Sequence, residues 1–289
     1  MHGEGEQLEE FPQLHISLEA ANELLSQVDI SINECQTRID DKRAPFSFLT
    51  KSKAEIIVTA QYEKSAKTMN VVGTIEGTDP DLKDEYLVIG AHLDHVGSQA
   101  GLLFPGANDN ASGSAAILKL AEAFKKVKQN HRSLSFYLLA SEEYRYVNSV
   151  SSTKHFVENL NLPTGQAGID TSQIIAMLNL DCIGYGDSIQ IGNGKSSPEL
   201  WSLASKIDKE NFNLGLMIPG MAAGTDLTPF YEKRESTGLY FVSKYSYDHL
   251  HLPTDTPETL NTVLFEKIVK LAYLASEELL MELYKEKHY

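Results

Sequence analysis

The chain has few cysteines, few basic residues and no long apolar run, and each shortage excludes a class of protein. Its 289 residues include two cysteines, Cys35 and Cys182, which are too few for a disulfide framework but enough for one bridge. No apolar stretch approaches the roughly 20 residues of a membrane span. Acidic side chains outnumber basic ones by 40 to 25, a net charge of −15, so the surface repels phosphate backbones and we expect no nucleic-acid partner.

The N-terminal part is expected to be separate from the main domain. The opening Met-His-Gly-Glu-Gly-Glu lacks the basic and apolar regions of a signal peptide. Ser17, with Glu19 in the first turn after it, predicts an N-capped helix. We expect residues 1–53 to form an N-terminal segment and residues 54–289 one compact domain, because a hydrophobic content of 42% suffices for one large core.

Strand-like and helix-like patterns alternate through the main domain. Strands are predicted at residues 54–60, 70–77, 86–91, 134–140, 174–180 and 239–242, and a helix at 113–127. This alternation predicts an α/β fold with a mostly parallel central sheet and helices on both faces. Polar residues at the carboxyl ends of such strands converge on one edge, where open α/β sheets bind ligands.

The C-terminal region carries a second helix signal. Thr256, Pro257 and Glu258 form a cap, a proline at the first helical position and an acid in the first turn. Apolar residues after them, including Ile268 and Leu271, recur at helical spacing. We therefore predict a long helix that begins at residue 257 and packs one face on the core.

Histidines and carboxylates lie directly after several of the predicted strands and in the loops between them. They are His92, Asp94, Asp109, Glu142, Glu143, Asp181 and His251. A carboxylate that bridges two cations holds them roughly 3.5–4 Å apart, and a water between them loses much of its proton affinity. A nearby carboxylate that is not a ligand can take the proton of that water and pass it to a departing amine. These residue types predict a two-metal hydrolytic site.

Five motifs resemble the zinc aminopeptidases of peptidase family M28 in order and spacing, over roughly residues 55–289. They are His92-Leu-Asp94, Asn108-Asp109-Asn110-Ala-Ser-Gly, Glu142-Glu143, Asn179-Leu-Asp181 and His251-Leu-Pro-Thr-Asp. The resemblance implies the α/β/α sandwich of zinc exopeptidases. It also implies a metal-dependent aminopeptidase that acts on peptides with a free N-terminus.

The resemblance further implies a role for each matching residue. Glu142 would be the general base, and Asp94 would accept a hydrogen bond from the His92 ring and fix its tautomer. Two Zn²⁺ per chain are implied, with Co²⁺ or Mn²⁺ able to replace them. The implied ligands are His92 and Asp181 for one ion, Glu143 and His251 for the other, and Asp109 bridging both. We interpret His95 and His249 as packing or hydrogen-bonding neighbours of the ligands.

Some positions depart from the family pattern. Arg145 and Asn148 stand where many members have glycines, and Thr225-Asp226-Leu227 replaces a common Ser-Asp-His. The donor that stabilises the oxyanion therefore stays open among four tyrosines: Tyr185, Tyr231, Tyr245 and Tyr247.

Two alternative functions also stay open. One is a mono-zinc acyltransferase of the glutaminyl-cyclase type on the same fold, and the other is a non-catalytic binding or receptor module. Within the peptidase reading, a carboxypeptidase or dipeptidase specificity and the oligomeric state are not settled by the sequence. Residues 11–21 resemble the tail of a protease-associated domain, which implies a processed portion of an exported protein, although the sequence also fits a cytoplasmic one.

Overall fold

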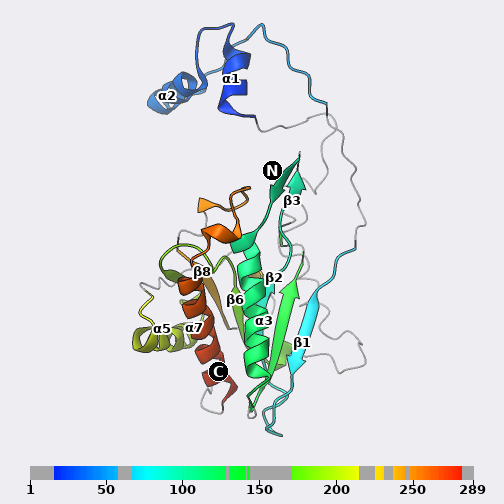
Figure 1. Cartoon of the computed structure of the whole chain (residues 1–289). Helices are drawn as coiled ribbons and strands as arrows, with labels where there is room; N and C mark the ends of the chain where they lie inside the picture. Colours follow the sequence, from blue (N-terminus) through cyan, green and yellow to red (C-terminus); the bar gives the residue numbers. More distant parts are fainter. Residues whose placement is uncertain are drawn as a thin grey trace. The chain divides into compact units, whose positions relative to one another are not determined.

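The chain divides into two compact units, Met1–Ala66 and Lys67–Tyr289 (Figure 1). The computed structural model describes residues 16–57, 67–99, 101–127, 130–140, 142–143, 171–214, 225–230, 237–244 and 248–281. Within these ranges, no helix is both long and apolar enough to cross a membrane. Both cysteines are free and buried.

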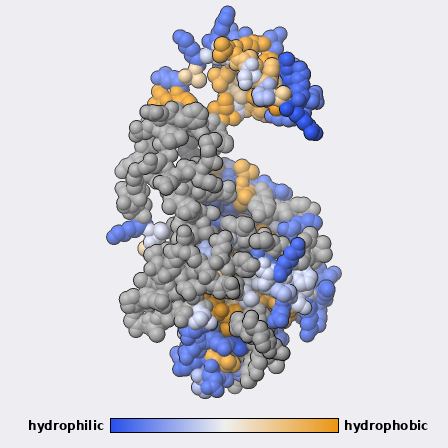
Figure 2. Space-filling view, turned by 180° about the vertical axis from the view of Figure 1, so that it is seen from behind, coloured by the Kyte–Doolittle hydropathy of each residue, from blue (hydrophilic) through white to orange (hydrophobic). Residues whose placement is uncertain are grey.

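The described part of the first unit contains two short helices, α1 (Leu18–Leu25) and α2 (Ile32–Lys42). Ser17 caps α1 as predicted by accepting the N–H of Ala20. Figure 2 shows apolar side chains gathered on the surface of this unit, and Cys35 is the one buried hydrophobic residue in its described part. The strand predicted at residues 54–60 is absent from 54–57, which have no regular structure; the remainder lies outside the described residues.

The second unit is built on a six-stranded sheet in the order β1-β5-β2-β6-β8-β7. The strands are β1 (Val71–Ile75), β2 (Tyr86–His92), β5 (Ser133–Leu139), β6 (Ile174–Leu180), β7 (Ile189–Gly192) and β8 (Gly238–Ser243). The four central strands are parallel, whereas β1 and β7 are antiparallel to their neighbours. A short hairpin of β3 (Gly97–Gln99) and β4 (Leu102–Phe104) stands apart. The predicted mostly parallel sheet is confirmed.

Three helices pack on one face of the sheet: α3 (Gly113–Phe124), α5 (Pro198–Asn211) and α7 (Thr262–Leu280) (Figure 1). Side chains alternate between the two faces of a strand, so Ile89 joins the core under these helices while Val88 joins a second cluster on the opposite face. Leu227 and Phe230 belong to that second cluster, and residues 228–230 are helical. Burial on both faces explains why the central strands are continuous apolar runs.

The start of α7 differs from the prediction. Pro257–Thr259 form only a short 3₁₀ turn, η5, and Leu260 returns to an extended conformation with ψ 135°. The long helix begins at Thr262, where the Asn261 side chain accepts the N–H of Leu264. The cap-and-proline signal therefore marks the 3₁₀ turn that precedes the helix.

The parallel strands bring the predicted polar residues to one edge of the sheet. His92, the last residue of β2, pairs with Leu139 at the end of β5, three residues before Glu142. β6 ends at Leu180, directly before Asp181. The loop that follows residue 248 lies at this same end of the sheet, drawn in orange in Figure 1.

Candidate metal centre

Three side chains from separate segments meet at the end of β2. The Nε2 atom of His92 lies 3.2 Å from Asp109 Oδ1 and 3.2 Å from Asp181 Oδ1, and all three residues are buried. One ring nitrogen carries at most one hydrogen and cannot donate fully to both carboxylates. Donors bound to zinc at 2.0–2.1 Å in a tetrahedron are about 3.3–3.4 Å apart. The spacing therefore fits a cation held by all three side chains.

A second group shares Asp109 with the first. The Nε2 atom of His251 lies 2.9 Å from Glu143 Oε2, 3.1 Å from Glu143 Oε1 and 3.2 Å from Asp109 Oδ2. Asp109 thus directs one oxygen toward His92 and the other toward His251. This is the arrangement that a carboxylate bridging two cations requires.

The pKa values of the cluster show an excess of buried negative charge. Burial opposes protonation of His92, but the carboxylates of Asp181 and Asp109 outweigh it and raise the pKa of His92 well above its usual value. Burial acts to raise the pKa of Asp109, yet hydrogen bonds from His251 and His92 bring this pKa below its usual range. Burial raises the pKa of Glu142 to about 8, and the charge of Asp181 adds to the effect. Buried carboxylates in such excess favour a bound cation.

Asp94 has a different partner from the predicted one. The Nδ1 atom of His92 faces the Asp94 main-chain carbonyl at 3.1 Å, whereas the nearest Asp94 carboxylate oxygen is 4.0 Å away. The carboxylate instead accepts the main-chain N–H groups of Glu142 and Glu143, each at 3.2 Å. Asp94 therefore fixes the turn that carries the two glutamates, and its carbonyl orients the His92 ring.

The segment after Gly106 holds the loop that carries Asp181. The Asn110 side chain accepts the N–H of Cys182 and donates to the carbonyl of Leu180, while Asn108 accepts the N–H of Gly184. Ser112 accepts the N–H of Ile183. These bonds span about 70 residues of sequence and explain why polar side chains alternate along this motif. We call Asn108, Asn110 and Ser112 the loop clamp.

Asp255 is a positioning residue to which the sequence analysis assigned no role. It is 1% exposed, and its carboxylate accepts the main-chain N–H groups of Asn108 at 2.8 Å and Asp109 at 3.1 Å. The His251 loop is thereby joined to the Asp109 segment. The available signal was its place at the end of the His251-Leu-Pro-Thr-Asp motif.

His95 also lies in the cluster, although the sequence analysis placed it outside the ligand set. Its Nδ1 atom is 3.2 Å from Glu143 Oε1 and 3.8 Å from Asp109 Oδ2. His249, in contrast, bonds Thr254 Oγ1 through Nδ1. His95 and His249, for which the sequence predicted the same role, therefore differ: His95 lies in the cluster and His249 lies outside it.

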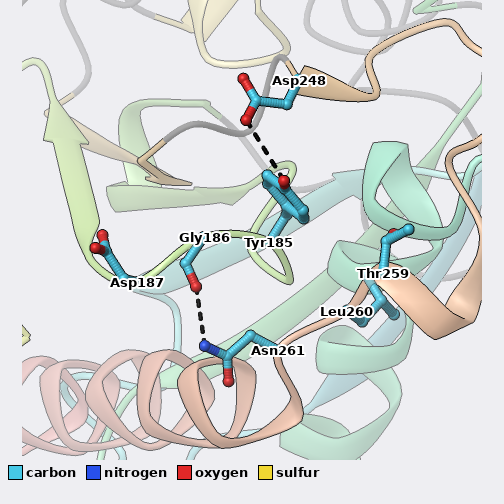
Figure 3. Close-up of a pocket in the computed structure, with 7 residues that line it drawn as sticks. All are labelled: Tyr185, Gly186, Asp187, Asp248, Thr259, Leu260 and Asn261. Atoms are coloured by element: carbon cyan, nitrogen blue, oxygen red, sulfur yellow. Dashed lines mark hydrogen bonds between the residues drawn. The ribbon is translucent and has the colours of Figure 1, made fainter.

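A pocket of about 340 Å³ is lined by residues of two loops that also carry members of the cluster and by the segment before α7. Figure 3 shows Tyr185, Asp187 and Asp248 around it, with the Tyr185 hydroxyl donating to Asp248 at 3.4 Å. Asn261 completes the wall by donating to the Gly186 carbonyl. Tyr185 follows Asp181 by four residues and Asp248 precedes His251 by three, so pocket and cluster share two loops.

Five of the residues named for their departure from the family pattern or as oxyanion donors lie outside the described residues: Arg145, Asn148, Tyr231, Tyr245 and Tyr247.

Comparisons with known proteins show similarity in sequence and in fold. An aminopeptidase from Pseudomonas aeruginosa is 33% identical over 141 residues, which are 48% of this chain and 23% of that protein. The chain thus spans about a quarter of the length of this relative. A solved zinc aminopeptidase from Bacillus subtilis shares the fold with a TM-score of 0.61 at 18% identity, covering 75% of this chain and 51% of that one.

A glutaminyl cyclase from Porphyromonas gingivalis shares the fold to the same extent. Its TM-score is 0.60 at 15% identity, and the match covers 73% of this chain and 77% of that one. At these identities the structural matches show a common fold alone. The sequence model of peptidase family M28 matches residues 70–275, which include the two groups around Asp109. The chain belongs to peptidase family M28.

Proposed function

We propose that this chain is a metal-dependent aminopeptidase that removes N-terminal residues from peptides at a two-zinc centre. The observation that carries the proposal is the position of Asp109, whose two oxygens face His92 and His251 at 3.2 Å each. Membership of family M28 and the similarity to named aminopeptidases support the same activity.

Each proposed ligand has a donor atom turned into the cluster. The proposed ligand set is His92 and Asp181 for one ion, Glu143 and His251 for the other, and Asp109 for both. Bound zinc supplies a Lewis acid that lowers the pKa of a water and polarises the scissile carbonyl. The oxygen and nitrogen donors also suit Co²⁺ or Mn²⁺.

Glu142 is the residue that moves the proton in this proposal. It adjoins the ligand Glu143, and its main-chain N–H is held by Asp94. Burial keeps the pKa of Glu142 high, so the carboxyl group holds a proton well once it has accepted one; bound cations would lower that pKa. Glu142 accepts a proton from the attacking water and delivers it to the departing amine.

The substrate is a peptide whose free amino group is attracted by the carboxylates at this edge of the sheet. The pocket that shares two loops with the cluster adds Asp187 and Asp248, two acidic side chains that favour a cationic group. Export of the chain, inferred from the N-terminal resemblance, stays a prediction that cell fractionation would test.

The second candidate is a glutaminyl cyclase with one zinc ion, which the shared fold favours. A single ion would need only one group of donor atoms, whereas Asp109 lies between two such groups. The number of ions per chain therefore separates the two functions.

The deciding experiment combines metal content with hydrolysis. Elemental analysis should give close to two zinc ions per chain, and a panel of aminoacyl-p-nitroanilides should be hydrolysed until a chelator is added. One ion with cyclisation of N-terminal glutamine and no hydrolysis would favour the cyclase. No metal and no turnover would favour a binding module.

A further inference from the structure

The second group of donors contains one more histidine than the proposed ligand set. The His95 side chain is 10% exposed, and its Nδ1 atom lies 3.2 Å from Glu143 Oε1 and 3.8 Å from Asp109 Oδ2. The rings of His95 and His251 meet edge to face with centroids 5.7 Å apart. Two imidazoles therefore approach the same two carboxylates.

Neither neutral tautomer of His95 is satisfied by the described residues alone. If Nδ1 carries the hydrogen, it can donate to Glu143, but Nε2 is then a buried acceptor to which no described residue donates. If Nε2 carries the hydrogen, the lone pair of Nδ1 faces the oxygens of Glu143 and Asp109. A lone pair turned toward two carboxylates is unfavourable unless a cation lies between them.

The main chain fixes the His95 ring in this position. Gly106 has φ +67°, and a Cβ atom there would come within 2.6 Å of the ring's Cγ and 2.7 Å of its Cδ2. The ring thus packs on the glycine main chain with Nδ1 turned to the cluster. Close approach of this kind needs glycine on both counts, the positive φ and the missing side chain.

We propose that His95 is a direct ligand of the second metal ion through Nδ1. The inference rests on the proposed two-zinc function. The second ion then has four protein ligands, His95, Asp109, Glu143 and His251, while the first has three. A site closed by four side chains holds its ion more firmly, and a site with an open position is free to bind water or substrate. The second ion is therefore the one that resists a chelator longer.

Magnetic resonance of the whole chain can test the ligand directly. Zinc is replaced by an NMR-active isotope of cadmium, and the histidine ring nitrogens are labelled with an NMR-active isotope of nitrogen. We expect three ring nitrogens to show scalar coupling to cadmium, two of Nε2 type and one of Nδ1 type. In His95→Gln the Nδ1 signal should be lost, and one of the two ions should bind at least tenfold more weakly in a competition titration.

The matched control is His249→Gln, which removes a histidine from the loop of His251 but outside the cluster. This variant should keep all three coupled nitrogens. Two bound ions with only two coupled nitrogens, both of Nε2 type, in the unaltered chain would overturn the proposal, whatever His95→Gln does. Fewer than two bound ions would instead contradict the proposed two-zinc function, so the two failures are distinguishable.

Discussion

At the scale of single residues, the centre depends on carboxylates that differ in what they face. Asp109 faces histidines on two sides, Asp94 faces main-chain N–H groups, and Glu142 adjoins the cluster with a raised pKa. Removing the charge of each carboxylate should therefore affect a different property of the centre. Asp109→Asn and Glu142→Gln keep the shape of the side chain and remove its charge, whereas His251→Ala removes a donor ring.

Asp109→Asn should lower the bound metal from near two ions per chain to one or fewer. The amide keeps the shape of the side chain but supplies only one oxygen and no charge, so it cannot serve both groups. His251→Ala should lower the occupancy of the second ion alone. Elemental analysis after dialysis measures both. Asp187→Asn, at an exposed position outside the cluster, is the control, and unchanged occupancy in Asp109→Asn would refute the bridging role.

Glu142→Gln should retain both ions and lose roughly 10²- to 10⁴-fold in kcat, because the ligands are untouched while the proton carrier is gone. Steady-state kinetics on the best p-nitroanilide, with metal content measured on the same sample, checks this. Glu122→Gln on the exposed surface of α3 should change neither quantity. A variant with unaltered kcat would remove Glu142 from the role of general base.

At the scale of elements, the loop clamp joins the start of α3 to the carboxyl end of β6. Asn110 alone bonds three main-chain groups: the N–H of Gly113, the N–H of Cys182 and the carbonyl of Leu180. Because Asn110 is only 2% exposed, water cannot readily replace these hydrogen bonds. The position of Asp181 is thus fixed by a side chain from another element.

Asn110→Ala should lower the free energy of unfolding by about 3 kcal/mol, since three buried main-chain groups lose their partner. Urea denaturation measures the change, and metal affinity should fall in parallel because Asp181 is no longer held in place. Lys119→Ala removes an exposed ion pair with Glu122 on α3 and should cost less than about 1 kcal/mol. A loss equal to that of this control would show that the clamp does not hold the loop.

At the scale of the whole molecule, we expect metal binding and folding to be coupled. The proposed ligands come from segments between His92 and His251, and only the folded second unit brings them together. An ion that binds the folded state at 100 times its Kd stabilises it by about 2.7 kcal/mol. The concentrated negative charge of the cluster adds to the cost of folding without metal.

Removal of metal by a chelator should therefore lower the Tm by roughly 5–10 °C, and stoichiometric zinc should restore it. Differential scanning calorimetry of the same preparation measures both steps. Magnesium at equal ionic strength is the control, because it binds histidine poorly and should not restore the Tm. A Tm that does not respond to chelator would mean that the cluster holds no structural cation.

The sequence by itself determined the four parallel strands and the motifs of the centre, but not the edge strand β7 or the hairpin of β3 and β4. β6 runs from Ile174 to Leu180 as predicted, because a buried parallel strand is a continuous apolar run bounded by polar residues. Asp181 could be placed at the sheet edge for the same local reason. Motif order and spacing then indicated the family, which the match over residues 70–275 confirms.

Only the tertiary structure decided which groups face one another. The Asp94 carboxylate bonds the Glu142 and Glu143 main chain, Asp255 holds the Asp109 segment, and His95 enters the cluster. These contacts join segments far apart in sequence, and hydrogen bonds form or fail over fractions of an ångström. Local apolar patterns fix which face of an element is buried. They do not fix the distance between two side chains carried by different elements.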